Sequence, residues 1–412
     1  MKTKLYLLLI VICLIYVGTG SANSAIGSTW PAISLDIGVP ISWQGYNVMV
    51  MYLASSCGAV SVQHLLSRFR TWLPAVCGMA VVGVCMIVYS HLHSFPSLLV
   101  CSAVIGYCMG VEAPIVNGYV AKHYPAYAIN WLHCCFGIGS TLAPPVMAYF
   151  LTAKDSWRMG FQTISIAEFC IMAALIISIP LWRLHGPVFP GEKYQAAETI
   201  DSSHNLKTIK LSELFRLPGG KSIPINMFIY CSFEVTIYFW ATSFLTEEKG
   251  MSPGVAAGLM TFVYGGQVAG RIIGSFLTMK FSDRQIIRVG LIVSLAGIIA
   301  FTMAPDSMIP LIFLIVGIAS GPIFPLYIHE VPSIVGKEAA QAVIGLQMAS
   351  ANLGNALIPL LVGIISGIFG FKVFPFALLV LIALSVVLKM TQDYKLSVGF
   401  AAESEAGALR RF

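Results

Sequence analysis

The sequence predicts an all-α membrane protein of about twelve transmembrane helices, arranged as two similar six-helix halves. Its composition requires a membrane as the solvent, because 57% of the 412 residues are hydrophobic, 10% are charged and the mean hydropathy is +0.83. A typical soluble domain carries about 25% charged residues. A soluble fold of this length could not bury so much apolar surface, so the apolar segments must face lipid.

Twelve apolar segments are long enough to cross a hydrocarbon core of about 30 Å, which takes about 20 helical residues. They are residues 5–30, 46–66, 72–90, 98–122, 127–152, 159–184, 223–245, 255–279, 285–304, 308–330, 337–365 and 371–390. We therefore predict a first bundle over 1–184, a central cytoplasmic loop over 185–221 with one short amphipathic helix, a second bundle over 222–391 and a cytoplasmic tail over 392–412. The basic, apolar start imitates a signal peptide, but we keep it as the first helix because the charge distribution is then consistent.

Basic residues in the loops indicate the orientation. With both termini in the cytoplasm, 19 of the 24 Lys and Arg residues lie on the cytoplasmic side and four on the other. Short cytoplasmic loops carry an excess of positive charge, so we expect a multi-pass protein of the inner (plasma) membrane with both ends inside. The net charge of +6 forms no patch that could follow a phosphate backbone. The bilayer is therefore an expected partner and nucleic acid is not.

Glycines and prolines repeat between the two halves at a nearly constant offset. The matched pairs are Gly58 and Gly270, Gly106 and Gly317, Gly110 and Gly321, Pro114 and Pro325, Gly139 and Gly354, and Pro144 and Pro359, at offsets of 211 to 215. Each match alone is weak, but their order indicates a duplicated six-helix unit. Parallel repeats of this kind hold a solute between the halves near the membrane midplane.

Four ionisable residues lie inside the apolar segments: Glu112, Glu168, Glu234 and Arg271. Charge at the bilayer centre costs at least ~2.5 to 3.5 kcal/mol, and intramembrane carboxyls often belong to proton relays. We predict that Glu112 and Glu234, near the middle of their segments, couple transport to protons, and such a carboxyl can also accept a hydrogen bond from a sugar hydroxyl. A structural carboxyl held by a neighbouring helix is the alternative for both.

The other two ionisable residues have simpler expected roles. For Glu168 we favour a structural role in packing against its own bundle. Arg271 lies near a segment end and is a candidate gate that pairs with another helix during the transport cycle. A static clamp, or snorkelling to the interface, would explain Arg271 equally well.

Amides and rings inside the segments are candidates for a solute site. Amides offer donors and acceptors to hydroxyl groups, and rings offer an apolar platform to the C–H face of a polyhydroxy ligand. Asn and Gln also join membrane helices to one another, so the pattern is only mildly specific. The candidates are Asn23, Trp30, Asn117, Asn130, His133, Trp240, Tyr264, Gln267, Gln347, Asn352 and Asn355.

Catalytic and metal chemistry are not expected. The sequence has no His-Glu-x-x-His zinc motif and no cysteine pair at metal-ligand spacing. Its Gly-rich segments follow no strand, which excludes a nucleotide-binding loop. We expect no enzyme activity, no metal, no cofactor other than a proton gradient, a small-molecule substrate and a monomer.

Six segments carry a resemblance to a known family: NWLHCCFGIGSTLAPP, WRMGF, FEVTIYFWATSFL, GGQVAGRIIGSFL, GIASGPIFPLY and ASANLGNALIP. With these segments the sequence resembles the fucose:proton symporter branch of the major facilitator superfamily over nearly its whole length. The resemblance implies the major facilitator fold and alternating access. It also implies a coupling carboxylate that Glu112, followed by Asn117, matches.

Two features depart from that branch. The branch often has an Asp in its first helix, where this sequence has Asn23, and an amide cannot carry a proton. The segment HLLSRFRTW lacks the Asp and Gly of the usual superfamily signature. Coupling through two carboxylates is therefore not implied.

The residues and the resemblance together predict a secondary active transporter of a sugar or sugar-like metabolite, coupled to protons by symport. Two alternatives stay open. Efflux of drugs or amphiphilic metabolites by proton antiport would fit the seventeen methionines and the aromatic content. A transport-inactive membrane sensor is the other.

Overall fold

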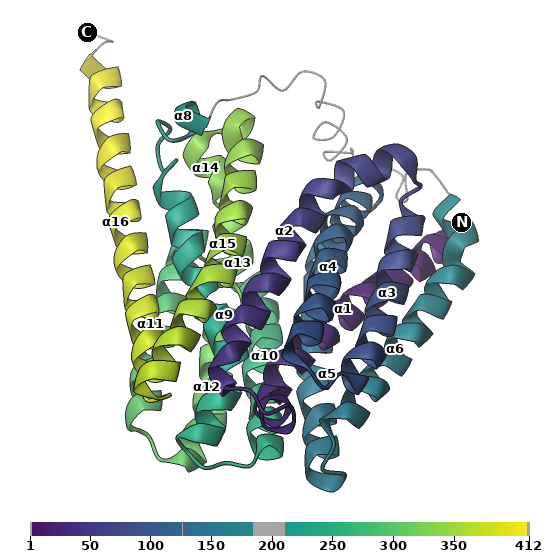
Figure 1. The fold of residues 1–412 in the computed structure, drawn as a ribbon. Coiled ribbons are helices and arrows are strands. Elements are labelled where there is room, and N and C mark those ends of the chain that lie inside the picture. The colour runs from purple at the N-terminus through teal and green to yellow at the C-terminus, as the bar shows by residue number, and fades with distance from the viewer. Residues whose placement is uncertain (1, 126, 184–210, 410–412) are drawn as a thin grey trace.

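The computed structural model describes residues 2–125, 127–183 and 211–409, and these fold into two helical bundles (Figure 1). In the first bundle the helices are α1 Lys2–Asp36, α2 Gln44–Arg68, α3 Trp72–His91, α4 Phe95–His123, α5 Tyr127–Ala153 and α6 Trp157–Ser178, with short helices η1 Ile41–Trp43 and η2 Ile179–Arg183. The short helix α8 Leu211–Leu214 precedes the second bundle, whose helices are α9 Ser222–Glu247, α10 Pro253–Leu277, α11 Asp283–Met303, α12 Ile309–Ser320, α13 Ile323–His329, α14 Val331–Val335, α15 Lys337–Phe369 and α16 Val373–Leu409, with η4 Asp306–Met308.

In the described part of the chain, twelve helical segments are long enough to cross a membrane. Within the described residues, eleven segments are long and apolar enough to span it, and α12 to α14 count among them as one. Helix α10 is the twelfth, because its 25 residues extend over roughly 37 Å at 1.5 Å per residue. It carries Gln267 and Arg271, which lower its hydropathy. The α12 to α13 break follows from Pro322, whose ring removes a helical hydrogen bond.

The two bundles repeat the same helix pairing. In the first, α1 packs on α5, α2 on α4 and α3 on α6; in the second, α9 packs on α15, α10 on α12 and α11 on α16. Between the bundles, α5 meets α10, α2 meets α15 and α1 meets α9. The sequence repeat is therefore a structural repeat.

The repeated glycines lie where paired helices cross most closely. A Cβ atom on Gly106 would lie 2.1 Å from the Met51 carbonyl oxygen, and one on Gly317 would lie 2.3 Å from that of Val263. The carbonyls themselves keep the offset, since Met51 and Val263 are 212 positions apart. The same correspondence of glycine and facing carbonyl holds for Gly58 with Gly270, Gly110 with Gly321 and Gly139 with Gly354. Small residues let membrane helices approach at their backbones.

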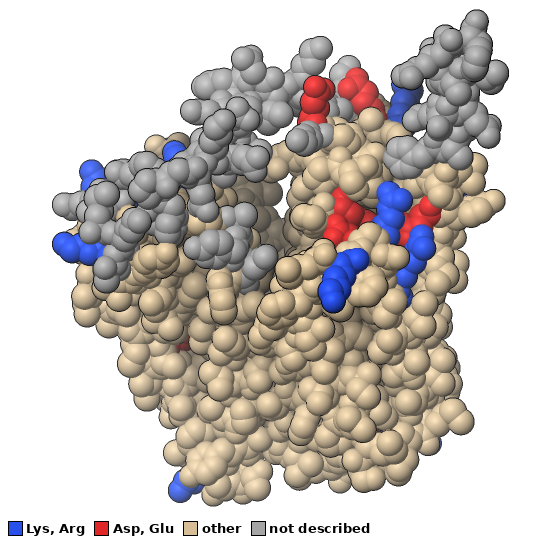
Figure 2. Space-filling model, turned by 180° about the vertical axis from the view of Figure 1, so that it is seen from behind, with Lys and Arg blue, Asp and Glu red and all other residues tan. Residues whose placement is uncertain are grey.

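The bundles touch at the end remote from both termini and spread toward the end that carries them (Figure 1). At the closed end the Thr242 hydroxyl of α9 donates to the Gly27 carbonyl of α1 at 2.9 Å. A Cβ on Gly45 of α2 would lie 2.8 Å from the Cα of Leu360 of α15. Figure 2 shows the charged side chains gathered near the ends of the molecule, with a broad belt almost free of charge between them.

A buried cluster of charges ties α16 to its neighbours near the end that carries the termini. Lys389 Nζ lies 2.5 Å from Glu330 Oε1 and 3.2 Å from Asp393 Oδ1, and all three residues are buried. Arg288 of α11 reaches Asp393 Oδ2 at 2.6 Å. Removing one member of such a group leaves a buried charge unpaired, which is strongly destabilising.

This cluster explains why α16 is longer than expected. The sequence predicted a helix end at Met390, but α16 continues to Leu409. The polar residues after Met390 have partners inside the bundle. Asp393 pairs with Lys389 and Arg288, and Gln392 accepts a hydrogen bond from Asn226 Nδ2 at 2.6 Å. In the central loop, α8 at 211–214 falls in the expected short helix around LSELFRL, and 185–210 lie outside the described residues.

We predict that Gly110→Ala lowers the unfolding temperature. Its Cβ would lie 1.9 Å from the Ser55 carbonyl oxygen and force α2 and α4 apart, and overpacking costs about 1 to 3 kcal/mol. The matched control is Gly78→Ala, where a Cβ meets no atom within 4 Å. Thermal unfolding of the purified protein measures both, and an equal loss in both variants would contradict the close-crossing role.

Candidate functional site

The second bundle carries a buried carboxyl group near the middle of α9. Glu234 lies on α9 and keeps 9% of its surface exposed. Its Oε1 atom accepts from the Tyr230 hydroxyl at 2.8 Å, the Tyr238 hydroxyl at 3.3 Å and the Gln267 amide of α10 at 2.7 Å. Both tyrosines are four residues from Glu234, so they lie on the same helix face. Gln267 also contacts the Tyr238 hydroxyl.

The first bundle presents an amide at the equivalent place. Asn23 of α1 and Glu234 of α9 are 211 positions apart, and Tyr52 of α2 and Tyr264 of α10 are 212 apart. These are the offsets of the repeat. The Asn23 side chain approaches the Tyr52 hydroxyl, and Tyr264 packs on Tyr238 with ring centroids 5.0 Å apart. Equivalent positions of the repeat thus carry a neutral amide in the first bundle and a carboxyl in the second.

A second polar group forms around Tyr16 of α1. Glu112 of α4 is 2% exposed, its Oε2 accepts from the Thr19 hydroxyl of α1 at 2.7 Å, and its Oε1 has no partner among the described residues. Asn117 of α4 approaches the Tyr16 hydroxyl, and the His133 ring of α5 meets Tyr16 edge-on at 5.8 Å. The structure therefore brings Glu112, Asn117 and His133 together.

Glu168 lies against another part of α1. It is fully buried on α6, the Ser21 hydroxyl lies 3.5 Å from its Oε1, and its Oε2 has no partner within the described ranges. A Cβ on Gly18 would lie 2.4 Å from Oε2. Helix α6 is therefore packed through Glu168 onto α1.

Helix α1 is the common element of these groups. Thr19 contacts Glu112, Ser21 contacts Glu168, and Asn23 lies beside Tyr52 at the bundle interface. Thr19 and Asn23 are one helical turn, about 6 Å, apart. A shift of α1 would therefore alter the surroundings of both candidate regions together.

Arg271 connects the two bundles. Its Nη1 donates to the His133 carbonyl of α5 at 2.9 Å, and its Nε donates to the Gly321 carbonyl at the α12 to α13 break at 3.4 Å. Across the described part of the chain, no carboxylate lies within ion-pair distance of it. It borders a cavity of about 430 Å³ lined from both bundles, including by Cys134 and His329.

Two predicted lining residues lie at the closed end. Trp30 and Trp240 are fully buried in the cores of their bundles. Their indole N–H groups donate to the carbonyls of Ile41 at 2.6 Å and Pro359 at 2.9 Å. In this conformation both tryptophans pack the closed end rather than the Glu234 or Glu112 group.

The remaining candidates lie on α15 or outside the described side chains. Gln347 is fully buried and donates to the Tyr327 carbonyl at 3.1 Å. Asn352 and Asn355 are half-buried. The side chain of Asn130 lies outside the described residues. Among the described side chains, no hydrogen bond joins Gln347, Asn352 or Asn355 to Glu234.

The sequence reading missed several residues of these groups. Tyr16, Thr19, Tyr52, Tyr230 and Tyr238 supply hydroxyls to the two regions, yet tyrosine and threonine are ordinary in membrane helices. Tyr230 and Tyr238 are each four residues from Glu234, and this helical spacing could have indicated that their hydroxyls lie near the carboxyl. No group of three or more His, Cys, Asp or Glu suited to a metal ion occurs in the part of the chain that the structure describes.

The sequence matches a known family along nearly its whole length. The family model of the Major Facilitator Superfamily matches residues 12–218 and 223–410. The chain belongs to the Major Facilitator Superfamily. It is therefore a multi-pass membrane protein of a transporter family rather than an enzyme, and its twelve crossings in two repeated bundles are the major facilitator fold.

Individual relatives of this facilitator are distant. It is 21% identical over 378 residues to "Bypass of stop codon protein 6" from Saccharomyces cerevisiae, which covers 82% of this chain and 73% of that protein. A bacterial homolog of the human lysosomal transporter Spinster, in an inward-facing and occupied conformation, matches with a TM-score of 0.72 and 15% identity over 95% of this chain and 96% of that one. The nucleoside transporter NupG matches with a TM-score of 0.71 and 13% identity over 96% and 99%. At such identities these two structures share the fold.

We predict that Arg271→Gln loosens the contact between α5 and α10 in this facilitator. A hydrogen bond to a charged group contributes about 1.5 to 3 kcal/mol, so its loss shifts opening of the interface by about tenfold or more. Cys134 lines the same cavity as Arg271. The rate at which maleimide labels Cys134, measured by mass spectrometry of peptide fragments, should therefore rise by about tenfold in the variant. The control is Lys280→Gln, an exposed cation next to α10. Equal labelling rates in the two variants would show that Arg271 does not hold the interface.

Proposed function

We propose that this facilitator takes up a sugar or sugar-like metabolite together with protons, as in the fucose:proton symporter branch that its sequence resembles. One observation carries the proposal. Glu112 and Glu234 are buried carboxyls, one in each bundle, and neither has a cation within ion-pair distance among the described residues. Glu112 accepts from one hydroxyl, and Glu234 accepts from two hydroxyls and one amide.

The lack of an ion-pair partner for Glu112 and Glu234 among the described residues supports proton coupling for a physical reason. An unpaired carboxylate enclosed in a dry interface costs several kcal/mol, and a neutral acid avoids that cost. Enclosing Glu112 is therefore easier when it holds a proton. A proton gradient then biases the equilibrium between the two orientations of the bundles, because the protonated and charged states favour different ones.

The groups at the bundle interface support a polyhydroxy solute. Gln267 and Asn23 offer amide donors and acceptors, and the Tyr238 and Tyr264 rings offer an apolar face. NupG, which shares the fold, is named a nucleoside transporter, and a nucleoside also presents ring hydroxyls. The proposed solute class is thus a compact molecule with several hydroxyl groups.

The proposed setting is the inner (plasma) membrane, with both termini in the cytoplasm and a monomer as the working unit. Both termini lie on one face (Figure 1), and 19 of the 24 basic residues belong to that side. The two bundles of a single chain supply every group of the proposed site. The conformation described is then the one that faces the cytoplasm.

We predict that Glu112→Gln abolishes proton-driven accumulation but spares exchange. In liposomes, one pH unit drives at most about tenfold accumulation for one proton per solute, and the variant should show none. Counterflow of labelled solute should persist, because it needs no net proton movement. Glu338→Gln, an exposed carboxyl on α15, is the control and should accumulate normally.

The same assay separates the rival functions. Retained accumulation in both Glu112→Gln and Glu234→Gln would refute proton coupling through these groups. Solute movement against an inward proton gradient would identify efflux by antiport. Binding in a thermal-shift screen without any flux would identify a sensor.

A further inference from the structure

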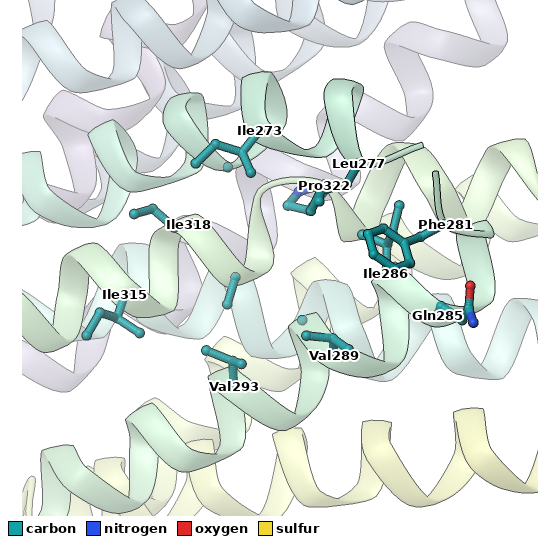
Figure 3. A pocket seen from close by; sticks show the side chains of 13 residues that line it. Ile273, Leu277, Phe281, Gln285, Ile286, Val289, Val293, Ile315, Ile318 and Pro322 are labelled. Carbon is teal, nitrogen blue, oxygen red and sulfur yellow. The ribbon is translucent and has the colours of Figure 1, made fainter. Parts of the chain in front are cut away.

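Two grooves open on the membrane-facing surface, one in each bundle. The groove of the second bundle lies between α10 and α11 over α12, with a cavity of about 380 Å³ (Figure 3). The groove of the first bundle lies between α2 and α3 over α4, with a cavity of about 390 Å³. Their walls carry large exposed apolar side chains within the crossings, such as Val81 and Val289. These walls therefore face lipid.

The two grooves are equivalent under the internal repeat. All ten residues that line the first groove correspond to lining residues of the second at an offset of 211 or 212. Phe69 corresponds to Phe281 and Gly78 to Gly290, at 212. Unrelated surface depressions would not be lined by equivalent residues in both bundles. The grooves are therefore a consequence of the helix packing that the two bundles share.

Basic residues lie next to a lining phenylalanine at one end of each groove, termed its mouth. Arg68 and Arg70 flank Phe69 in the α2 to α3 turn, and Lys280 precedes Phe281 in the α10 to α11 connection. All three basic residues are exposed, and no ion pair engages them within the described ranges.

Acidic groups distinguish the two mouths. Asp283 lies at the second mouth, where His329 engages it at 2.6 Å, and Arg284 there lies 4.0 Å from Asp393. The α2 to α3 turn contains no acidic residue. The first mouth therefore attracts an anion more strongly than the second.

We propose that each groove binds an acyl chain of an anionic phospholipid, with the headgroup at the basic mouth. An apolar chain fills a cavity that would otherwise leave the lining side chains without contacts. Basic residues beside the membrane surface attract anionic headgroups. The ligand is thus a membrane lipid, and its two sites are separate from the solute site between the bundles.

Photolabelling in nanodiscs tests the proposal. Phosphatidylglycerol and phosphatidylcholine, each with a diazirine on the acyl chain, are compared by mapping labelled peptides. Phosphatidylglycerol should label α2–α3 and α10–α11, and should exceed phosphatidylcholine by about tenfold at the first groove. Arg68→Gln with Arg70→Gln should remove that preference at the first groove and leave the second unchanged.

Filling the grooves provides the second arm. Cys77→Trp and Val289→Trp occupy equivalent positions, 212 apart, and each should reduce labelling of its own groove by about tenfold. The matched controls are Val84→Trp on α3 and Ile292→Trp on α11, which are exposed but line neither groove. Gly78→Leu serves if the tryptophan variants do not fold, because a Cβ there meets no atom within 4 Å.

Three results would overturn the proposal. The first is equal labelling in the filled and control variants. The second is equal labelling by the two lipids at the first groove of the wild-type protein. The third is crosslinks between copies of the chain at the grooves in place of lipid adducts, which would identify them as a contact surface of an oligomer.

Discussion

The architecture depends on the close approach of paired helix backbones at glycines. Within lipid, helices gain little from the hydrophobic effect against one another, so van der Waals contact decides which pairs form. Gly106 and Gly110 let α4 lie against α2, and Gly317 and Gly321 let α12 lie against α10. Because both bundles use the same crossings, they have the same shape. The interface between them then lies on the axis that relates them.

The side chains at the candidate site do not follow this symmetry. Asn23 and Glu234 occupy equivalent places, as do Tyr52 and Tyr264. A neutral amide can hold its hydrogen bonds throughout a cycle, whereas a carboxyl can change its charge. Repetition thus supplies the paired helices and the bundle interface, and a departure from repetition places the carboxyl of Glu234 where the first bundle has the amide of Asn23. The membrane-facing grooves, by contrast, keep the symmetry.

Particular residues show how far a sequence can be read and where the reading fails. Glu112, Asn117 and His133 were separate candidates, and the structure assembles them around Tyr16, a residue without any distinguishing pattern. Trp30 and Trp240 were expected to face a solute, yet their indoles bind backbone carbonyls at the closed end. Both outcomes depend on which helix faces which, and that is a property of the packed bundle.

The sequence by itself determined the membrane as solvent, the number of crossings and the duplication, because each of these follows from local hydropathy or from spacing along the chain. It also placed the carboxyls at membrane depth. Only the tertiary structure decided which polar groups meet, that α16 runs past Met390, and that Arg271 joins α5 through a carbonyl. The reason is that such contacts join residues far apart in the sequence, 138 positions for His133 and Arg271 and 166 for Asn226 and Gln392. These contacts depend on how the packed helices are rotated and where they cross, and the residue pattern of a single segment does not indicate either.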